Sequence, residues 1–226
     1  MTKTLIIVRH GESERNKLMD GAYAIDDKDI TNGQPLNHLT PLSEKGKNEA
    51  KEISKVLQKL NIKYDSAVHS GMVRARQTLE IIKTEMDLQD IKTYQVSLLR
   101  ERTNGYGYFL TKEELDTHFP YLQDHFKLTG NFHSTPPGGE SLIESSDRIC
   151  TFLNSFFDGH YGDTVLVACH GFAMRAIRFI LEEIPVEEVD HIEKFANCDF
   201  LQYEGVRGDM KLVKHYKTDN KQEGVM

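Results

Sequence analysis

The sequence is short of several features that would assign it to a specialised class of protein. It has three cysteines, an odd number, and their spacing matches neither a disulfide framework nor a metal site. It has no excess of positive charge, because 28 Lys and Arg face 35 Asp and Glu, for a formal charge of −7. Nucleic-acid binding depends on cations that neutralise phosphates, so this balance argues against a nucleic-acid partner. The cysteine usage favours a reducing, cytoplasmic location.

Long apolar runs are also missing. No stretch approaches the roughly 20 apolar residues that a membrane-spanning helix needs, so the sequence predicts no membrane partner. The apolar run at residues 5–8 is too short for a signal peptide and is followed at once by Arg9. The 226 residues, 38% hydrophobic and 28% charged, are typical of a globular protein with a substantial core. We therefore expect a single domain over residues 1–226.

Short apolar runs predict the strands of a sheet. The β-branched runs at 5–8 and 165–169 are typical of strands that helices cover on both faces. A shorter candidate strand lies at 67–68. Residues 199–204 and 210–216 are predicted to be edge strands, joined through a glycine-containing turn.

Helical patterns alternate with these strands. Thr40 followed by Pro41 predicts a helix start, with Thr40 as the N-cap. Apolar residues then recur at helical spacing in four segments: 53–60, 75–86, 149–157 and 173–184. Strands that alternate with helices predict an α/β fold with a mostly parallel central sheet.

Two segments interrupt this alternation. Residues 17–39 contain several aspartates together with turn-forming Asn, Gly and Pro, and we expect a long acidic surface loop there. Residues 103–138 are rich in Tyr and Phe and end in Pro-Pro-Gly-Gly, and we expect an inserted, partly helical cap. The aromatic residues of this cap either line an apolar pocket or form its own small core.

Histidines follow both of the strongly apolar strands. Arg9-His10-Gly11-Glu12-Ser13 comes directly after the first strand, and Cys169-His170-Gly171 follows the other. Function in open α/β sheets gathers at the carboxyl ends of strands. We therefore expect His10 and His170 to face each other across adjacent strand ends.

Arginine is concentrated in the same kind of segment. Arg74 opens a helix after the candidate strand at 67–68, where a guanidinium can bind phosphate oxygens in a forked geometry. Glu101 is flanked by two more arginines. Six of the ten arginines lie in these segments: Arg9, Arg15, Arg74, Arg76, Arg100 and Arg102. An acidic protein that gathers arginine near histidines has a local anion site.

Taken in order, these motifs resemble the histidine phosphatase superfamily, which includes cofactor-dependent phosphoglycerate mutases and many phosphatases. The match runs from residue 5 to about 184. The resemblance implies a three-layer α/β/α sandwich with a small helical cap insertion. The matching segments are Arg9-His10-Gly11-Glu12-Ser13 with Asn16, Ser70–Thr78 with Arg74, Leu99-Arg100-Glu101, Gly138-Gly139-Glu140-Ser141 and His170-Gly171.

The resemblance also implies roles for individual residues. His10 corresponds to the nucleophile that becomes phosphohistidine, and Glu101 to the group that protonates the leaving group and then activates water. His170 corresponds to the second catalytic histidine. The residues that the resemblance places around the phosphoryl group are Arg9, Asn16, Arg74 and Gly171, beside His170. The expected partner is a small phosphorylated substrate, and the chemistry calls for no metal and no cofactor.

Several departures from the mutase pattern favour a phosphatase. The chain has no tryptophan, and Arg15 stands where mutases usually carry one. Asn104 replaces a tyrosine after the proton donor, and Phe172 replaces the asparagine after the second His-Gly. The cap segment contains no arginine to hold a second anionic group. We expect phosphomonoester hydrolysis, with a phosphoglycerate mutase as the alternative.

Two other readings compete with this one. Cys169 and Arg175 have the Cys-x5-Arg spacing of cysteine-dependent phosphatases, although Ala168 and Ala176 stand where that motif usually has His and Ser or Thr. This reading leaves Arg9-His10-Gly11 unexplained. A non-catalytic sensor of phosphorylated ligands would have lost its nucleophile or donor, and neither is lost. The sequence leaves the substrate and the oligomeric state open.

Overall fold

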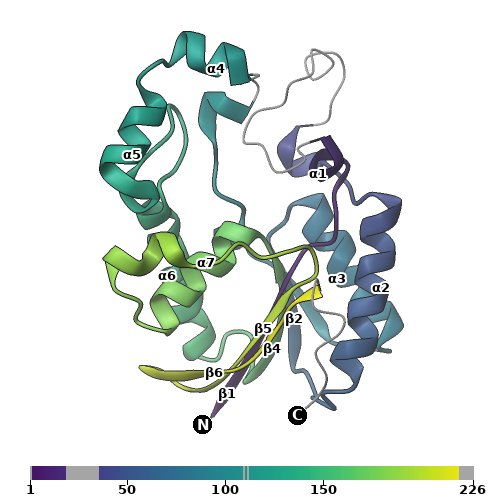
Figure 1. The fold of residues 1–226 in the computed structure, drawn as a ribbon. Helices are drawn as coiled ribbons and strands as arrows, with labels where there is room; N and C mark the ends of the chain where they lie inside the picture. Colours follow the sequence, from purple (N-terminus) through teal and green to yellow (C-terminus); the bar gives the residue numbers. More distant parts are fainter. Residues whose placement is uncertain (1, 19–35, 109, 111, 219–226) are drawn as a thin grey trace.

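The structure is a computed structural model, and it describes residues 2–18, 36–108, 110 and 112–218. Its centre is a six-stranded sheet with the strand order β3-β2-β4-β1-β5-β6 (Figure 1). Neighbouring strands are parallel from β3 to β1, and β5 and β6 add two antiparallel strands. The predicted α/β fold with a mostly parallel sheet is therefore confirmed. The strands are β1 (Lys3–Arg9), β2 (Ser66–His69), β3 (Lys92–Gln95), β4 (Thr164–Cys169), β5 (Phe200–Val206) and β6 (Asp209–Tyr216).

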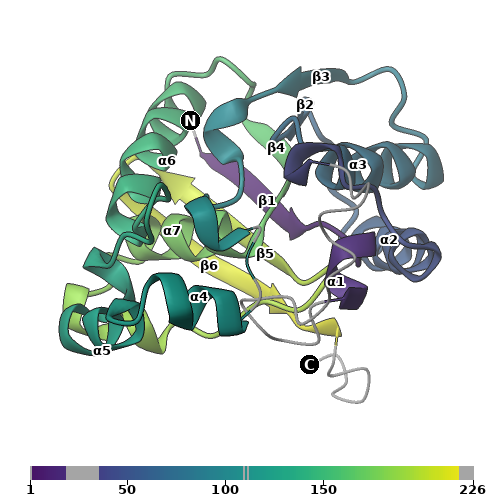
Figure 2. The ribbon, with the colours of Figure 1, turned by 90° about the horizontal axis from the view of Figure 1, so that it is seen from above.

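Helices cover both faces of this sheet, as the end-on view shows (Figure 2). Side chains alternate across a strand, so β1 contributes to two separate cores. Ile6 and Val8 pack with α2 (Glu44–Gln58) and α3 (Val73–Glu85). Leu5 and Ile7 pack with the helices of the opposite face, α6 (Leu142–Phe157) and α7 (Gly171–Leu181). The three-layer α/β/α arrangement follows from these two cores.

One predicted helix start and one of the two predicted edge strands are wrong, whereas β6 is an edge strand as predicted. The N-cap of α2 is Ser43, whose hydroxyl accepts the Gly46 N–H at 3.0 Å, whereas Thr40 ends a short 3-10 helix, η2 (Asn37–Leu39). β5 is not an edge strand, because it lies between β1 and β6. The other edge is β3, which the sequence pattern does not predict because its Lys-Thr-Tyr-Gln has no apolar run.

The segment after β3 begins with η3 (Ser97–Leu99). The helices within the predicted cap, residues 103–138, are η4 (Gly105–Tyr108), α4 (Lys112–His118) and α5 (Leu122–His133). Figure 1 shows α4 and α5 beyond the carboxyl ends of the strands, above α6 and α7. Phe132 of α5 is buried, with its ring 5.0 Å from that of Phe179 in α7. This aromatic residue of the cap therefore belongs to the core.

Two short helices complete the described chain, α1 (Glu14–Leu18) and η5 (Val186–His191). Residues 19–35, most of the predicted acidic loop 17–39, lie outside the described residues. Among the helices that the structure describes, none combines the length and the apolar character needed to cross a bilayer.

Candidate active site

The carboxyl ends of β1 and β4 bring the two predicted histidines together. His10 follows β1 and His170 follows β4, and the two strands are parallel neighbours. The His10 backbone N–H donates to the Cys169 carbonyl at 3.0 Å, which joins the strand ends. The two imidazole centroids lie 5.0 Å apart. The expected juxtaposition of His10 and His170 is therefore confirmed.

Gly11 allows the helix layer to approach the His10 loop. A Cβ atom on Gly11 would lie 2.4 Å from the backbone oxygen of Gly46, in the first turn of α2. A Cβ on Gly46 would lie 2.0 Å from the Glu12 carbonyl oxygen. Because both contacts are with backbone, neither can be relieved by a side-chain rotation. The glycine of Arg9-His10-Gly11 therefore has a packing reason that is separate from the chemistry of its neighbours.

The hydrogen bonds of His10 leave only one tautomer for its neutral ring. Nδ1 lies 2.7 Å from the Gly11 carbonyl oxygen, which can only accept, so Nδ1 carries the proton. Nε2 accepts from the Arg74 Nε–H at 3.1 Å, so Nε2 holds the lone pair. Burial, with the positive charges of Arg74 and Arg9, holds the pKa of His10 well below its usual range. The ring is therefore neutral at pH 7, with an unprotonated Nε2.

His170 is fully buried and has one nitrogen without a partner. Its Nε2 lies 2.7 Å from the Ser70 hydroxyl oxygen, which also accepts the Met72 N–H. A neutral ring that accepts the hydroxyl proton at Nε2 carries its own proton on Nδ1. Among the described residues, Nδ1 has no hydrogen-bond partner. Burial, and next the charge of Arg74, lowers the pKa of His170 well below its usual range.

Two predicted arginines flank the His10 ring, and each is anchored by a backbone oxygen. Arg74, at the start of α3, is buried and donates from Nη1 to the Asn37 carbonyl at 2.7 Å. Arg9 donates from Nη1 to the Phe195 carbonyl. The buried Arg9 Nε has no hydrogen-bond partner among the described residues. This nitrogen lies near the start of α7, because a Cβ built on Gly171 would be 3.8 Å from it.

Asn16 lies in α1, where its side chain is held by Ser13. Its Oδ1 accepts from the Ser13 hydroxyl at 2.9 Å and from the Ser13 N–H at 3.1 Å. The Asn197 amide, from the loop before β5, donates to the same oxygen at 3.5 Å and to the His10 carbonyl at 2.9 Å. Asn197 therefore links the nucleophile loop to Asn16. No motif in the sequence identified it, because its partners are distant in the chain.

Glu101 approaches the same place from the segment after η3. Its Oε1 accepts the Arg102 N–H at 2.9 Å and the Phe172 N–H at 3.2 Å. The second bond ties Glu101 to the first turn of α7, directly after Gly171. The predicted donor and the two predicted histidine loops are thus brought to one edge of the sheet.

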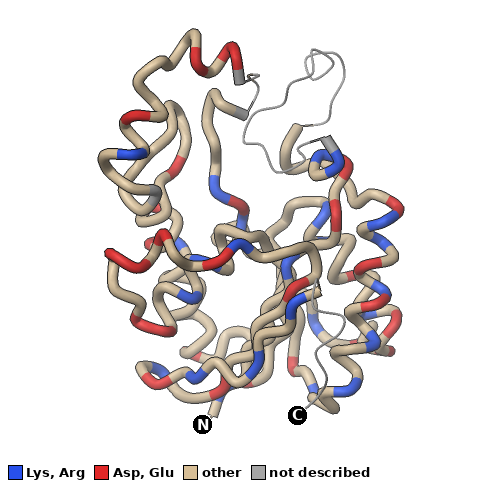
Figure 3. Tube along the Cα trace, in the orientation of Figure 1, with Lys and Arg blue, Asp and Glu red and all other residues tan. Residues whose placement is uncertain are grey.

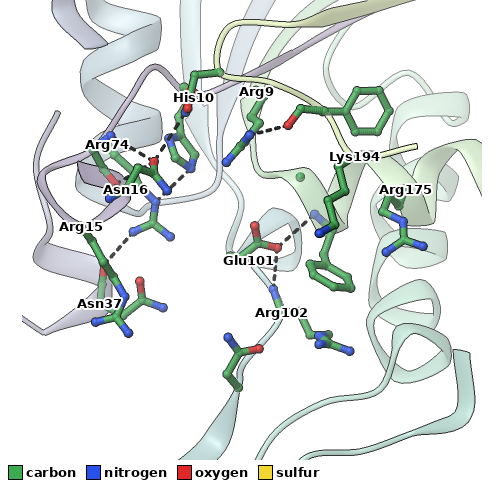
Figure 4. Close-up of a pocket in the computed structure, with 16 residues that line it drawn as sticks. Arg9, His10, Arg15, Asn16, Asn37, Arg74, Glu101, Arg102, Arg175 and Lys194 are labelled. Atoms are coloured by element: carbon green, nitrogen blue, oxygen red, sulfur yellow. Dashed lines mark hydrogen bonds between the residues drawn. The ribbon is translucent and has the colours of Figure 1, made fainter. Parts of the chain in front are cut away.

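These groups surround a single open pocket of about 420 Å³ (Figure 4). All of the predicted site residues line it except His170, which is fully buried with its ring centroid 5.0 Å from that of His10. The described residues that line the pocket are Arg9, His10, Ser13, Arg15, Asn16, Asn37, Arg74, Glu101, Arg102, Asn104, Gly171, Phe172, Arg175, Lys194, Phe195 and Asn197.

The pocket is far more cationic than the protein as a whole. Acidic residues are spread over outer helices such as α2, α4 and η5 (Figure 3), whereas Glu101 is the one carboxylate among the described residues that line the pocket. The cap has no arginine, but cations from other segments line the pocket. Arg102 comes from the segment after η3, Arg175 from α7 and Lys194 from the loop before β5.

The Phe172 ring contacts two of these cations. The Arg102 guanidinium lies 4.0 Å from the centre of the Phe172 ring, and that of Arg175 lies 5.3 Å from it. A guanidinium group within about 6 Å of an aromatic ring centre is attracted to the face of the ring. The phenylalanine that replaces the mutase asparagine therefore has a structural role beside the pocket.

Cys169 gives the cysteine-dependent reading no support. The residue is fully buried in the core under α6 and α7, and it does not belong to the pocket lining. Burial raises the pKa of its thiol, which disfavours the nucleophilic thiolate. Arg175 does line the pocket, but it donates from Nη2 to the Val189 carbonyl at 3.1 Å. Cys169 and Arg175 therefore do not form a phosphate loop.

Comparison with known proteins agrees with the motifs. The sequence model of the histidine phosphatase superfamily (branch 1) matches residues 5–218. A 2,3-bisphosphoglycerate-dependent phosphoglycerate mutase of Bartonella bacilliformis is 31% identical over 84% of this chain and 86% of its own length. A mutase of the same description from Mesorhizobium japonicum is 32% identical over 85% of this chain and 88% of its own.

Solved structures with the same fold have other activities. The α-ribazole phosphatase of Shigella flexneri matches with a TM-score of 0.74 at 17% identity, over 99% of both chains. A mycobacterial glucosyl-3-phosphoglycerate phosphatase matches with a TM-score of 0.72 at 19% identity, over 96% of this chain and 100% of its own. At these identities the likeness concerns the fold alone.

Proposed function

Since the chain belongs to the histidine phosphatase superfamily, we propose that it hydrolyses phosphomonoesters through a phosphohistidine formed on His10. One observation carries the proposal. The neutral His10 imidazole holds an unprotonated Nε2, which accepts the Arg74 Nε–H, and close to this ring are two buried N–H donors that have no partner among the described residues, Arg9 Nε and His170 Nδ1. An unsatisfied buried donor costs about 1–3 kcal/mol. A phosphoryl group bound at Nε2 would supply oxygens to both donors.

In the first step, the His10 Nε2 lone pair attacks phosphorus and the ester P–O bond breaks. The departing alkoxide takes a proton from the Glu101 carboxyl. Negative charge on the phosphoryl oxygens is balanced by the Arg9 and Arg74 guanidinium groups, which backbone carbonyls already hold in place. Such fixed charge is most of what phosphoryl transfer requires of a protein.

In the second step, water attacks the phosphohistidine. The Glu101 carboxylate takes the water proton, a new P–O bond forms and the N–P bond breaks. His10 returns to its neutral tautomer with Nδ1 bonded to the Gly11 carbonyl, and inorganic phosphate leaves. Neither step uses a metal or an organic cofactor, because guanidinium groups supply the positive charge.

A mutase reaction is the second candidate, and the pocket's charge favours it. Arg102, Arg175 and Lys194 line the pocket beyond the two arginines beside His10. They would attract a second anionic group on the substrate, as a bisphosphate carries. In that reaction the phosphohistidine returns its phosphoryl group to an organic hydroxyl instead of to water.

The experiment that separates the two candidates follows the fate of the phosphoryl group. Purified protein is given a panel of phosphomonoesters and, separately, 3-phosphoglycerate primed with 2,3-bisphosphoglycerate. We expect release of inorganic phosphate to be faster than interconversion of the phosphoglycerates. Primed interconversion that outpaces hydrolysis of every monoester would assign the mutase reaction instead.

A further inference from the structure

One residue of the Gly138–Ser141 motif has no part in the steps above. Glu140 lies directly before α6, where Ser141 forms the helix cap together with Glu144. The carboxylate of Glu140 takes no part in that cap. It bonds to the segment that carries Glu101.

Glu140 contacts this segment on both sides of Glu101. Its Oε2 accepts the Thr103 N–H at 3.1 Å, and its own N–H donates to the Thr103 carbonyl at 2.8 Å. The Arg100 guanidinium donates to Oε1 from the other side. The residue before Glu101 and the residue two positions after it are thus bound to one side chain.

Arg148 of α6 extends the same contact. It donates to Glu140 from Nε at 3.1 Å and from Nη2 at 3.3 Å, so that the guanidinium meets both carboxylate oxygens. It also donates from Nη1 to the Leu98 carbonyl. The side chains of Arg148 and Glu140 are 9% and 15% exposed, so solvent screens this ion pair only weakly.

Glu101 depends on the path of this segment. Its Oε1 is held by two backbone N–H groups, one on Arg102 and one on Phe172. The first belongs to the segment that Glu140 fixes, and the second belongs to α7. A shift of the segment would therefore separate Glu101 from α7 and from the pocket.

We propose that Glu140 is a positioning residue that holds Glu101 where it can protonate the leaving group. The inference rests on the proposed function, because it takes Glu101 as the proton donor. Misplacement of a reacting group by about 1 Å can cost on the order of 100-fold in rate. Loss of Glu140 should therefore weaken catalysis only where the leaving group needs a proton.

The test uses the rate of phosphoenzyme formation, measured by rapid quench, with an alkyl phosphate and with nitrophenyl phosphate. An alkoxide leaves poorly without a proton, whereas nitrophenolate leaves readily. Glu140→Gln should lose roughly 10- to 100-fold on the alkyl phosphate and less than about 3-fold on nitrophenyl phosphate. Glu144→Gln is the matched control, because glutamine also serves in the helix cap, and it should lose little on either substrate.

A double substitution shows whether Glu140 acts through Glu101. In a Glu101→Gln background, Glu140→Gln should lower the rate on the alkyl phosphate by less than about 3-fold, because the donor is already absent. If Glu140→Gln fails to fold, Glu140→Asp keeps the charge with a shorter reach and should show a smaller loss with the same dependence on the leaving group.

Equal losses of Glu140→Gln on both substrates, or fully additive losses in the double variant, would overturn the positioning role. If Glu101→Gln itself loses equally on both substrates, Glu101 is not the donor, and the positioning role falls with it. Phosphohistidine formation on His10 would still stand in that case, so the two failures are distinguishable.

Discussion

The two central strands are followed by the same dipeptide but present it differently. His10-Gly11 follows β1 directly, and His170-Gly171 follows β4. His10 lines the pocket, and its Nε2 accepts from Arg74. His170 is fully buried, and its Nε2 is held by Ser70. Both rings therefore carry their proton on Nδ1, but the Nδ1–H of His10 is bonded to the Gly11 carbonyl, whereas that of His170 has no partner among the described residues.

The largest effect is expected when the nucleophilic nitrogen of His10 is removed. His10→Ala should lower turnover by at least about 10⁴-fold, as loss of a nucleophile does in enzymes that form a covalent intermediate. Steady-state release of phosphate from the best substrate measures this loss. A decrease of only tenfold would mean that another group attacks phosphorus.

The next largest effect is expected for Glu101, which protonates the leaving group that His10 displaces. The size of this effect should depend on the substrate. Glu101→Gln keeps the shape of the side chain but cannot transfer a proton. General-acid catalysis is typically worth about 10²–10⁴-fold, and we expect that loss on alkyl phosphates. Nitrophenyl phosphate should be affected much less, because its leaving group does not need the proton. Equal losses with phosphoenzyme formation rate-limiting would mean that Glu101 only binds substrate or supports the fold.

A smaller effect is expected at the second strand end. His170→Gln removes the buried donor, and loss of one such donor costs roughly 10²–10³-fold in kcat. The nucleophile remains, so the variant should still form a phosphoenzyme, only more slowly. Absence of the phosphoenzyme in a folded His170→Gln protein would mean that the two histidines are not separate in function.

Features of the strand ends that depend on neighbouring residues could be predicted from the sequence, whereas those that depend on contacts between distant segments could not. The apolar runs of β1 and β4 and the His-Gly pairs after them are local signals, so both the sheet and the meeting of the histidines were predictable. β3 was missed because its sequence has no apolar run, and Thr40 was mistaken for a cap because Ser43 lies only three residues later.

The cations of the pocket were harder to predict. Lys194 and Asn197 reach the site from the loop before β5, so only the folded chain shows that they line it. In the sequence, Arg175 has only the spacing to Cys169 as a signal. Contacts between segments far apart in the sequence leave no periodic pattern, so the composition of the cap alone does not predict the positive charge of the pocket.

The smallest expected effect is on the pH dependence of folding stability, and it has the same direction for His10 and His170. Burial holds the pKa of both His10 and His170 well below the unfolded value of about 6.5. Below that pH the unfolded chain binds protons that the folded rings do not, so stability present above pH 6.5 is lost as the pH falls. Each ring contributes up to about 1.4 kcal/mol per pH unit.

Thermal melting between pH 7.5 and 5 measures this loss. His10→Asn and His170→Asn should each make the decline in Tm shallower, although His69 and His215, whose pKa values are also lowered by burial, keep part of it. A decline that is unchanged in both variants would mean that neither ring is held neutral by the fold.

The most direct test of the account is to locate the phosphoryl group on the protein. A substrate-labelled sample is quenched in alkali, where phosphohistidine is stable, digested and sequenced by mass spectrometry, with Cys169→Ala as the control. We predict an acid-labile phosphate on His10, present in wild type and in Cys169→Ala and absent from His10→Ala. A phosphate on Cys169, or a label that survives in His10→Ala, would contradict the assignment of His10 as the nucleophile.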